Sequence, residues 1–74
     1  MTFQLHCASL GIELLRDDVK FIKHQLLQIP QQLHRSTLEQ YAITWLDAMA
    51  QCDIVYRKQN LGRRAANTYL RELP

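Results

Sequence analysis

Apolar residues recur every three or four positions in the first half of the chain, and this spacing constrains the fold more than any other feature. The series consists of Ile12, Leu15, Val19, Ile22, Leu26 and Ile29. Such spacing places side chains on one face of an α-helix, so it predicts a helix that buries one side. Ser9 and the Asp17–Asp18 pair are alternative starts, and Pro30 should end the helix because it lacks a backbone N–H. Residues 1–8 are expected to be frayed or extended.

A second helix is predicted after Pro30. Residues 30–35 suit a single helical turn, and Ser36 and Glu39 have the spacing of a capping box, in which each side chain binds the other's free backbone N–H. The same three-and-four spacing then predicts a helix that continues to about Lys58. Its apolar face comprises Leu38, Ala42, Trp45, Met49, Cys52 and Tyr56.

A short third helix is predicted near the C-terminus. Residues 59–62 are interpreted as a turn, because Asn60 and Gly62 tolerate the backbone conformation that ends helices. Beyond it, Arg64, Asn67 and Arg71 share the polar side of the helix. The apolar side is formed by Ala65, Ala66, Tyr69, Leu70 and Leu73. No segment alternates polar and apolar residues as a strand would, so we expect an all-α fold. The prediction is a small three-helix bundle with one extra helical turn, in which residues 1–74 form a single domain.

The composition limits stability and excludes some classes of protein. A chain of 74 residues buries only about 60% of its unfolded surface, and 47% of the residues are apolar, enough for a core and a further apolar face. A homodimer is therefore an open alternative. The two cysteines are far apart, and neither a signal peptide nor an apolar run of about 20 residues is present. We expect a cytoplasmic protein without a membrane span.

No group of residues has the spacing of a catalytic or metal-binding motif. His6 and Cys7 are adjacent, so their side chains point in different directions, and His24 and His34 are interpreted as solvated. Cys52 is assigned to the core. These residues predict no metal site and no activated nucleophile.

The two adjacent carboxylates are not a catalytic pair either. Asp17 and Asp18 diverge on a helix, whereas an acid–base pair must converge on one substrate. We assign them to a helix N-terminus or to surface pairs with Lys20 or Lys23. The sequence therefore predicts no enzymatic activity, no cofactor and no small-molecule substrate.

Positive charge is concentrated near the C-terminus. From Val55 onward the chain has one acidic residue, Glu72. The cations of this region are Arg57, Lys58, Arg63, Arg64 and Arg71. Such residues can bind nucleic-acid phosphates, with Asn67 beside them as a base-contacting type. The alternative is a solvated polar face, and the net charge of +2 is low for a dedicated nucleic-acid binder.

Residues 29–73 also carry a family pattern. It combines Ile29-Pro30, Leu33-His34-Arg35, a helix centred on Tyr41 and Trp45, and the run Gly62-Arg63-Arg64-Ala65-Ala66-Asn67-Thr68-Tyr69-Leu70-Arg71-Glu72-Leu73. This pattern resembles the helical, non-catalytic segment ahead of the nuclease domain in replication initiation endonucleases of temperate tailed phages. The matching residues are Arg63, Arg64, Asn67, Tyr69 and Leu70. The resemblance implies a mobile-element origin and an association with DNA replication. It includes none of the family's metal-binding histidines or nucleophilic tyrosines, so it implies no cleavage activity.

Two functions are consistent with these features. We favour a small non-enzymatic binding module that contacts a protein partner or a second copy of itself through apolar residues the core does not need. Those residues are Phe3, Leu5, Leu10, Phe21, Leu27 and Ile54. The alternative is a nucleic-acid-binding accessory protein in DNA replication or regulation that uses the basic region 57–71.

Trp45 is expected to contribute more to the core than any other residue. Its burial is expected to dominate stability together with that of Leu15, Val19, Ile22, Leu26 and Leu38. Trp45→Ala should lower the free energy of unfolding by about 3–5 kcal/mol, which a domain of this size cannot lose and stay folded. Circular dichroism during a thermal melt measures the loss, and an unchanged melt would contradict the assignment.

Overall fold

The computed structural model of the protein describes residues 2–73; Met1 and Pro74 lie outside the described residues. Within residues 2–73 there are four α-helices and no strand, which confirms the all-α class but adds a helix to the predicted three. The helices are α1 (Thr2–Ser9), α2 (Arg16–Leu26), α3 (His34–Ala50) and α4 (Lys58–Arg71). Two single 3₁₀ turns, η1 (Gln31–Leu33) and η2 (Val55–Arg57), lead directly into α3 and α4.

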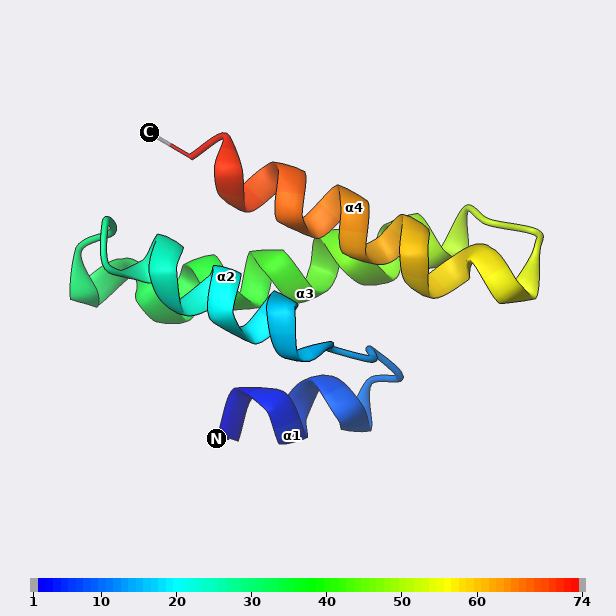
Figure 1. Ribbon diagram of the computed structural model, residues 1–74, viewed down its shortest axis with the longest axis horizontal. Coiled ribbons are helices and arrows are strands. Elements are labelled where there is room, and N and C mark those ends of the chain that lie inside the picture. The colour runs from blue at the N-terminus through cyan, green and yellow to red at the C-terminus, as the bar shows by residue number, and fades with distance from the viewer. Residues whose placement is uncertain (1, 74) are drawn as a thin grey trace.

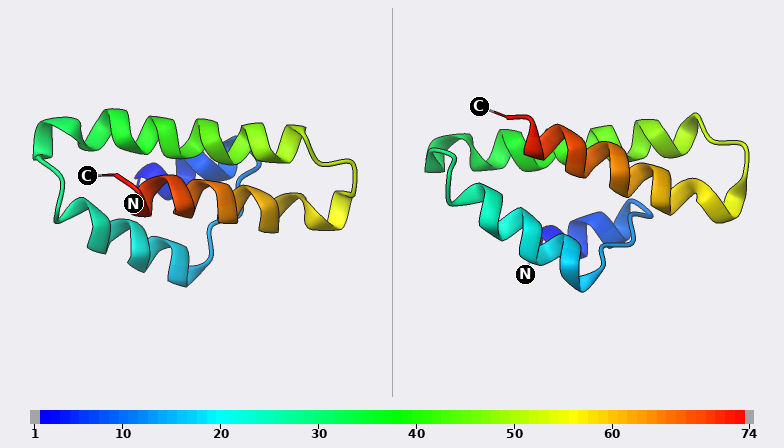
Figure 2. Two further views of the ribbon diagram at one scale, coloured as in Figure 1. Left: turned by 90° about the horizontal axis from the view of Figure 1, so that it is seen from above. Right: turned by 45° about the horizontal axis from the view of Figure 1, so that its top comes forward.

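The helices α3 and α4 form an antiparallel hairpin, on which the rest of the chain packs (Figure 1). Figure 2 shows α2 beside α4, on the side away from α3, and α1 beneath the other helices. Phe3 of α1 meets Tyr41 of α3 edge to face, with the ring centroids 6.3 Å apart. Each of the two shorter helices therefore completes the core by covering one side of the hairpin.

Every helix contributes to this core. Its largest fully buried side chains are Trp45, Tyr41, Ile22, Leu70 and Cys7. The prediction that Trp45 and Ile22 lie in the core is thus confirmed, and Leu26 and Leu38 pack against the core as expected. Leu15 is 55% exposed, so its assignment to the core was wrong. It precedes the first turn of α2 and lies outside the helical stripe to which the sequence pattern assigned it.

The N-terminal segment is helical, so the prediction that residues 1–8 are frayed or extended was wrong for the described residues. Cys7 is completely buried in the core that the other helices share, so tertiary contacts stabilise α1. Gly11, in the connection between α1 and α2, has a φ of +82°, a conformation that other residues rarely adopt. The chain turns at this glycine before α2 begins.

The entry into α3 also differs from prediction. The single turn after Pro30 is confirmed as η1, but α3 begins at His34, two residues before the predicted cap. The Ser36 hydroxyl donates to the Leu33 carbonyl oxygen (3.1 Å), and Glu39 pairs with Arg35 (3.4 Å), so no capping box forms. A chain already turning in η1 needs no side-chain cap to start the helix.

His34 is not the solvated residue that the sequence predicted. It is half-buried, and its Nε2 lies 2.8 Å from the carbonyl oxygens of both Leu26 and Ile29. Because carbonyl oxygens only accept, Nε2 carries the proton. The imidazole thereby satisfies backbone groups at the end of α2 and fixes the turn into α3.

The largest boundary error concerns α3 and α4. The second helix ends at Ala50 and not near Lys58, and residues 59–62, predicted as a turn, lie inside α4. Gly62 is buried, and a β-carbon at this residue would overlap the indole ring of Trp45. Glycine therefore serves close helix packing here and not chain reversal.

Gly62→Ala tests this packing, because the expected change in the free energy of unfolding is opposite in sign to the usual effect of this substitution. In a helix interior the change normally stabilises by about 1 kcal/mol. Here the added methyl group meets Trp45, so we expect a net loss of about 1–3 kcal/mol in urea denaturation. The loss should shrink in a Trp45→Phe background. A more stable Gly62→Ala protein would contradict this packing.

Candidate functional site

A polar network lies where the start of α2 meets α4. Its centre is Asp18, which is buried and accepts three hydrogen bonds. Arg63 Nε donates to Oδ2 (2.7 Å), the Leu15 backbone N–H donates to the same oxygen (2.9 Å), and Asn67 Nδ2 donates to Oδ1 (3.1 Å). Of the two predicted roles of Asp18, the position at a helix N-terminus is confirmed, because it lies in the first turn of α2, and the surface pair with Lys20 or Lys23 was wrong. Its carboxylate joins the first turn of α2 to α4.

Arg63 is held inside the protein by several groups at once. Besides its bond to Asp18, it donates to the Glu13 carbonyl oxygen (2.8 Å) and to Asn60 Oδ1 (2.9 Å). Its guanidinium carbon lies 5.2 Å from the centroid of the Trp45 ring, a cation–π contact. Only 19% of the side chain is exposed. Arg63 is thus a structural residue, and the reading of it as a free surface cation was wrong.

Two amides continue the network along the same face of α4. Gln59 accepts from the Trp45 indole N–H and from the Glu13 backbone N–H, both at 3.1 Å, and donates to the Gly11 carbonyl oxygen (2.7 Å). Asn67, which the sequence placed on the outward side of the helix, accepts from the Tyr41 hydroxyl (2.6 Å). Burial raises the pKa of Tyr41, so this hydroxyl remains a donor. Steps of four along α4 therefore give an inward polar stripe.

The other cations of the basic region stay at the surface, but they do not form one cluster. Arg57, Arg64 and Arg71 are exposed, and Lys58 is half-buried. Successive members of these three arginines are seven residues apart, so they form a row along η2 and α4 with steps of about 10 Å. The ion pairs found within residues 2–73 join Arg63 to Asp18 and Arg35 to Glu39, so none of them includes this arginine row.

Exposed apolar side chains gather at the connection between α3 and α4. Val55 and Tyr56 are 80% and 78% exposed, and Ile54 and Leu61 are also exposed. We call these four residues the hairpin tip. Ile54 was among the predicted contact residues, whereas Val55 and Tyr56 were missed because the second helix was expected to run through them.

The other predicted contact residues are scattered. Phe3 and Phe21 are half-buried against the core, and Phe21 also lies under Arg71, with the guanidinium carbon 5.8 Å from the ring centroid. Leu5, Leu10 and Leu27 are exposed, but they lie in α1, in the following connection and at the end of α2. They are therefore dispersed over three separate segments of the chain.

A groove between α3 and α4 begins at the hairpin tip. It has a volume of about 510 Å³. Its lining comprises Ala48 and Gln51 of α3 and Leu61, Arg64, Ala65 and Thr68 of α4. Leu61 belongs to both the tip and the groove, and Arg64 belongs to both the groove and the arginine row. Tip, groove and row therefore form one continuous surface of the hairpin.

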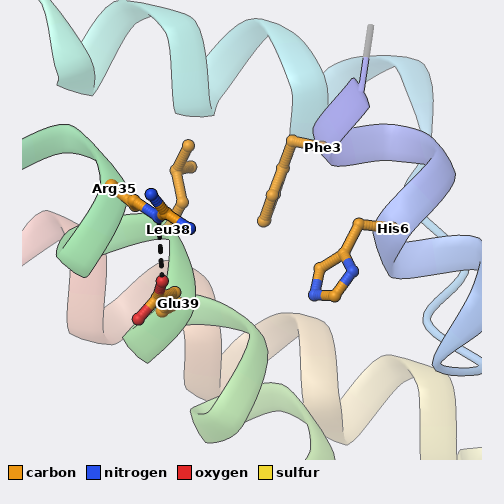
Figure 3. Close-up of a pocket in the computed structure, with 5 residues that line it drawn as sticks. All are labelled: Phe3, His6, Arg35, Leu38 and Glu39. Atoms are coloured by element: carbon orange, nitrogen blue, oxygen red, sulfur yellow. Dashed lines mark ion pairs between the residues drawn. The ribbon is translucent and has the colours of Figure 1, made fainter.

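A second hollow of about 520 Å³ lies between α1 and α3 (Figure 3). Phe3 and His6 face it from α1, and Arg35, Leu38 and Glu39 face it from α3. Arg35 and Glu39 pair with each other at strongly exposed positions, where an ion pair contributes little. Its lining shares no residue with the hairpin tip, whereas the lining of the groove includes Leu61.

Neither cysteine of the described residues belongs to a group that could hold a metal ion. Within the described residues, no three His, Cys, Asp or Glu side chains are placed to hold a metal ion. Burial raises the pKa of the Cys7 thiol to about 11, which disfavours the reactive thiolate. The Cys52 thiol is buried and donates to the Ile54 carbonyl oxygen (3.3 Å).

Among the described helices, none is long and apolar enough to cross a membrane.

Comparison with protein-family models, with curated proteins and with solved structures gave no match for this chain. The resemblance to the helical segment of phage replication endonucleases therefore stays a prediction, as does the absence of enzymatic activity. Of the five residues that carry the resemblance, Arg63, Asn67 and Leu70 have structural roles in this fold.

Asp18→Asn tests whether the buried ion pair supports the fold. The change keeps the shape of the side chain but leaves the Arg63 guanidinium without its counter-charge, so we expect a loss of about 2–4 kcal/mol in chemical denaturation. Glu39→Gln breaks the exposed pair with Arg35 and should cost less than about 0.5 kcal/mol. Equal effects of the two substitutions would show that the network is not specially stabilising.

Proposed function

We propose that this protein is a small binding module that recognises a protein partner through the hairpin tip and the adjoining groove. The observation that carries the proposal is the pair Val55 and Tyr56, both largely exposed at the junction of the two longest helices. Clustered apolar side chains with a polar rim are typical of protein-binding surfaces. Tyrosine and arginine, both present here, are the residues that most often dominate binding energy at such surfaces.

The position of the tip favours recognition by a rigid surface. The residues that follow it belong to α4, which the Gln59 and Arg63 hydrogen bonds hold against the core. Close contact between Gly62 and Trp45 fixes the distance between the two arms of the hairpin. A preformed surface loses little conformational entropy when a partner binds, so a small patch can still give useful affinity.

Nucleic-acid binding is a weaker explanation of the same surface. The Arg63 guanidinium is already hydrogen-bonded to Asp18 within the protein. The three exposed arginines lie near exposed apolar side chains, which do not attract phosphates. A nucleic acid would contact the arginine row and leave Val55 in water. The two functions therefore differ in whether the apolar tip is needed.

Photo-cross-linking in cells of the source organism tests the proposal. Benzoylphenylalanine in place of Tyr56 should give a discrete cross-linked protein, identified by mass spectrometry, whereas the same probe in place of exposed Lys20 on α2 should not. A product of twice the chain mass would identify a second copy as the partner. The absence of any discrete protein product specific to Tyr56 would contradict the proposal.

Val55→Asp should remove that product without loss of stability. Val55 is 80% exposed, so a carboxylate there is solvated in the free protein but unfavourable in an apolar interface. We expect cross-linking from residue 56 to fall at least about tenfold and the melting temperature to stay unchanged. Unaltered cross-linking would show that the tip is not the contact.

A further inference from the structure

The arginine row lies along the same side of α4 as the groove. Residues 57, 61, 64, 68 and 71 recur at steps of four and three, so they share one face of α4 and the turn before it. Leu61, Arg64 and Thr68 of this series line the groove. Arg57 and Arg71 precede and follow Arg64 by seven residues, and their guanidinium groups lie over the rings of Tyr56 and of Phe21 on α2. The exposed side of η2 and α4 beside the groove therefore carries an arginine every two helical turns over about 20 Å.

Two turns is also the interval at which side-by-side helices repeat their contacts. The groove is lined by Ala48 of α3 and Ala65 of α4, whose methyl side chains allow another backbone to come close. An extended strand repeats its side-chain directions every two residues and does not match this spacing. The shape of the groove and the spacing of the arginines along the helix beside it thus fit a helical partner.

From these features we infer that the partner inserts an amphipathic helix that carries carboxylates two turns apart, with apolar residues at one end for the hairpin tip. This inference rests on the proposed function and names the chemistry of its partner. Arg57, Arg64 and Arg71 are exposed, and no carboxylate within residues 2–73 forms an ion pair with them. An acidic helix supplies their counter-charges and guides the approach of the partner.

A second copy of the chain does not fit this surface. In a two-fold symmetric pair of such grooves, Arg64 at the middle of the row would face its own counterpart, and Arg57 would face Arg71. Three like-charge contacts would oppose association. The occupant is therefore a different protein.

Three synthetic helical peptides test the inference. They share one apolar face of leucine and alanine and a length of about 20 residues, enough to span the row. They differ only in Glu, Gln or Lys at seven-residue intervals. Fluorescence anisotropy with labelled peptide measures affinity, and amide chemical shifts of the ¹⁵N-labelled protein locate the contact. We expect the Glu peptide to bind at the groove about tenfold more tightly than the Gln peptide, and the Lys peptide more weakly still.

Charge reversal makes the test specific. Arg64→Glu should weaken the Glu peptide about tenfold and improve the Lys peptide, whereas Lys20→Glu, on α2, should leave the order of affinities unchanged. Equal binding of the Glu and Gln peptides, or binding of neither, would overturn the acidic-helix inference. The proposed function would still stand if Tyr56 cross-linked to a protein.

A 20-base-pair DNA duplex serves as the competing anion. The inference fails if the duplex binds more tightly than the Glu peptide at physiological salt, if Arg64→Glu weakens duplex binding, and if Val55→Asp leaves duplex binding unchanged. Those three results together would make the arginine row a phosphate-binding site. Conversely, if the Glu peptide binds as expected while Tyr56 gives no cross-linked protein, the proposed function fails although the groove accepts acidic helices.

Discussion

One buried ion pair, between Asp18 at the start of α2 and Arg63 in α4, joins separate parts of the fold. A carboxylate removed from water is costly unless its oxygens are bonded, and here three donors satisfy them. The same guanidinium lies over Trp45 and binds the backbone of Glu13. One side chain therefore links the second helix, the connection before it and the aromatic core. In a chain this small, one side chain that bonds to several segments supplies links that a bigger domain obtains from its larger apolar core.

The class of fold was predictable because it follows from local patterns. Apolar spacing indicated helices, Pro30 marked the turn into η1, and the size of the Trp45 side chain marked the core. The boundaries that failed are those where tertiary contacts override local preference. Gly62 looks like a helix terminator in sequence, but it lies within α4 because only a residue without a β-carbon fits against the indole ring. The α1 helix was missed because its stability comes from the burial of Cys7 and not from its own pattern.

The candidate site was predictable only in part, because the sequence shows which residues are charged but not which way their side chains point. The basic region was recognised, yet its residues divide between two faces of α4: Arg63 turns inward and Arg64 outward. The inward position could not be inferred, because the partner carboxylate, Asp18, is 45 residues away. The exposure of Val55 and Tyr56 was not predicted, because the second helix was expected to continue through both residues. A break in that helix exposes both of them.

The hydrogen bonds from α4 to the connection between α1 and α2 have a consequence for evolution. Gln59 and Arg63 reach main-chain atoms of Gly11 and Glu13, and no side chain of that connection takes part in these bonds. Main-chain atoms are common to nearly all amino acids, so position 13 can change freely while the link persists. Substitutions in homologues should therefore accumulate at that position while Gln59 and Arg63 remain invariant.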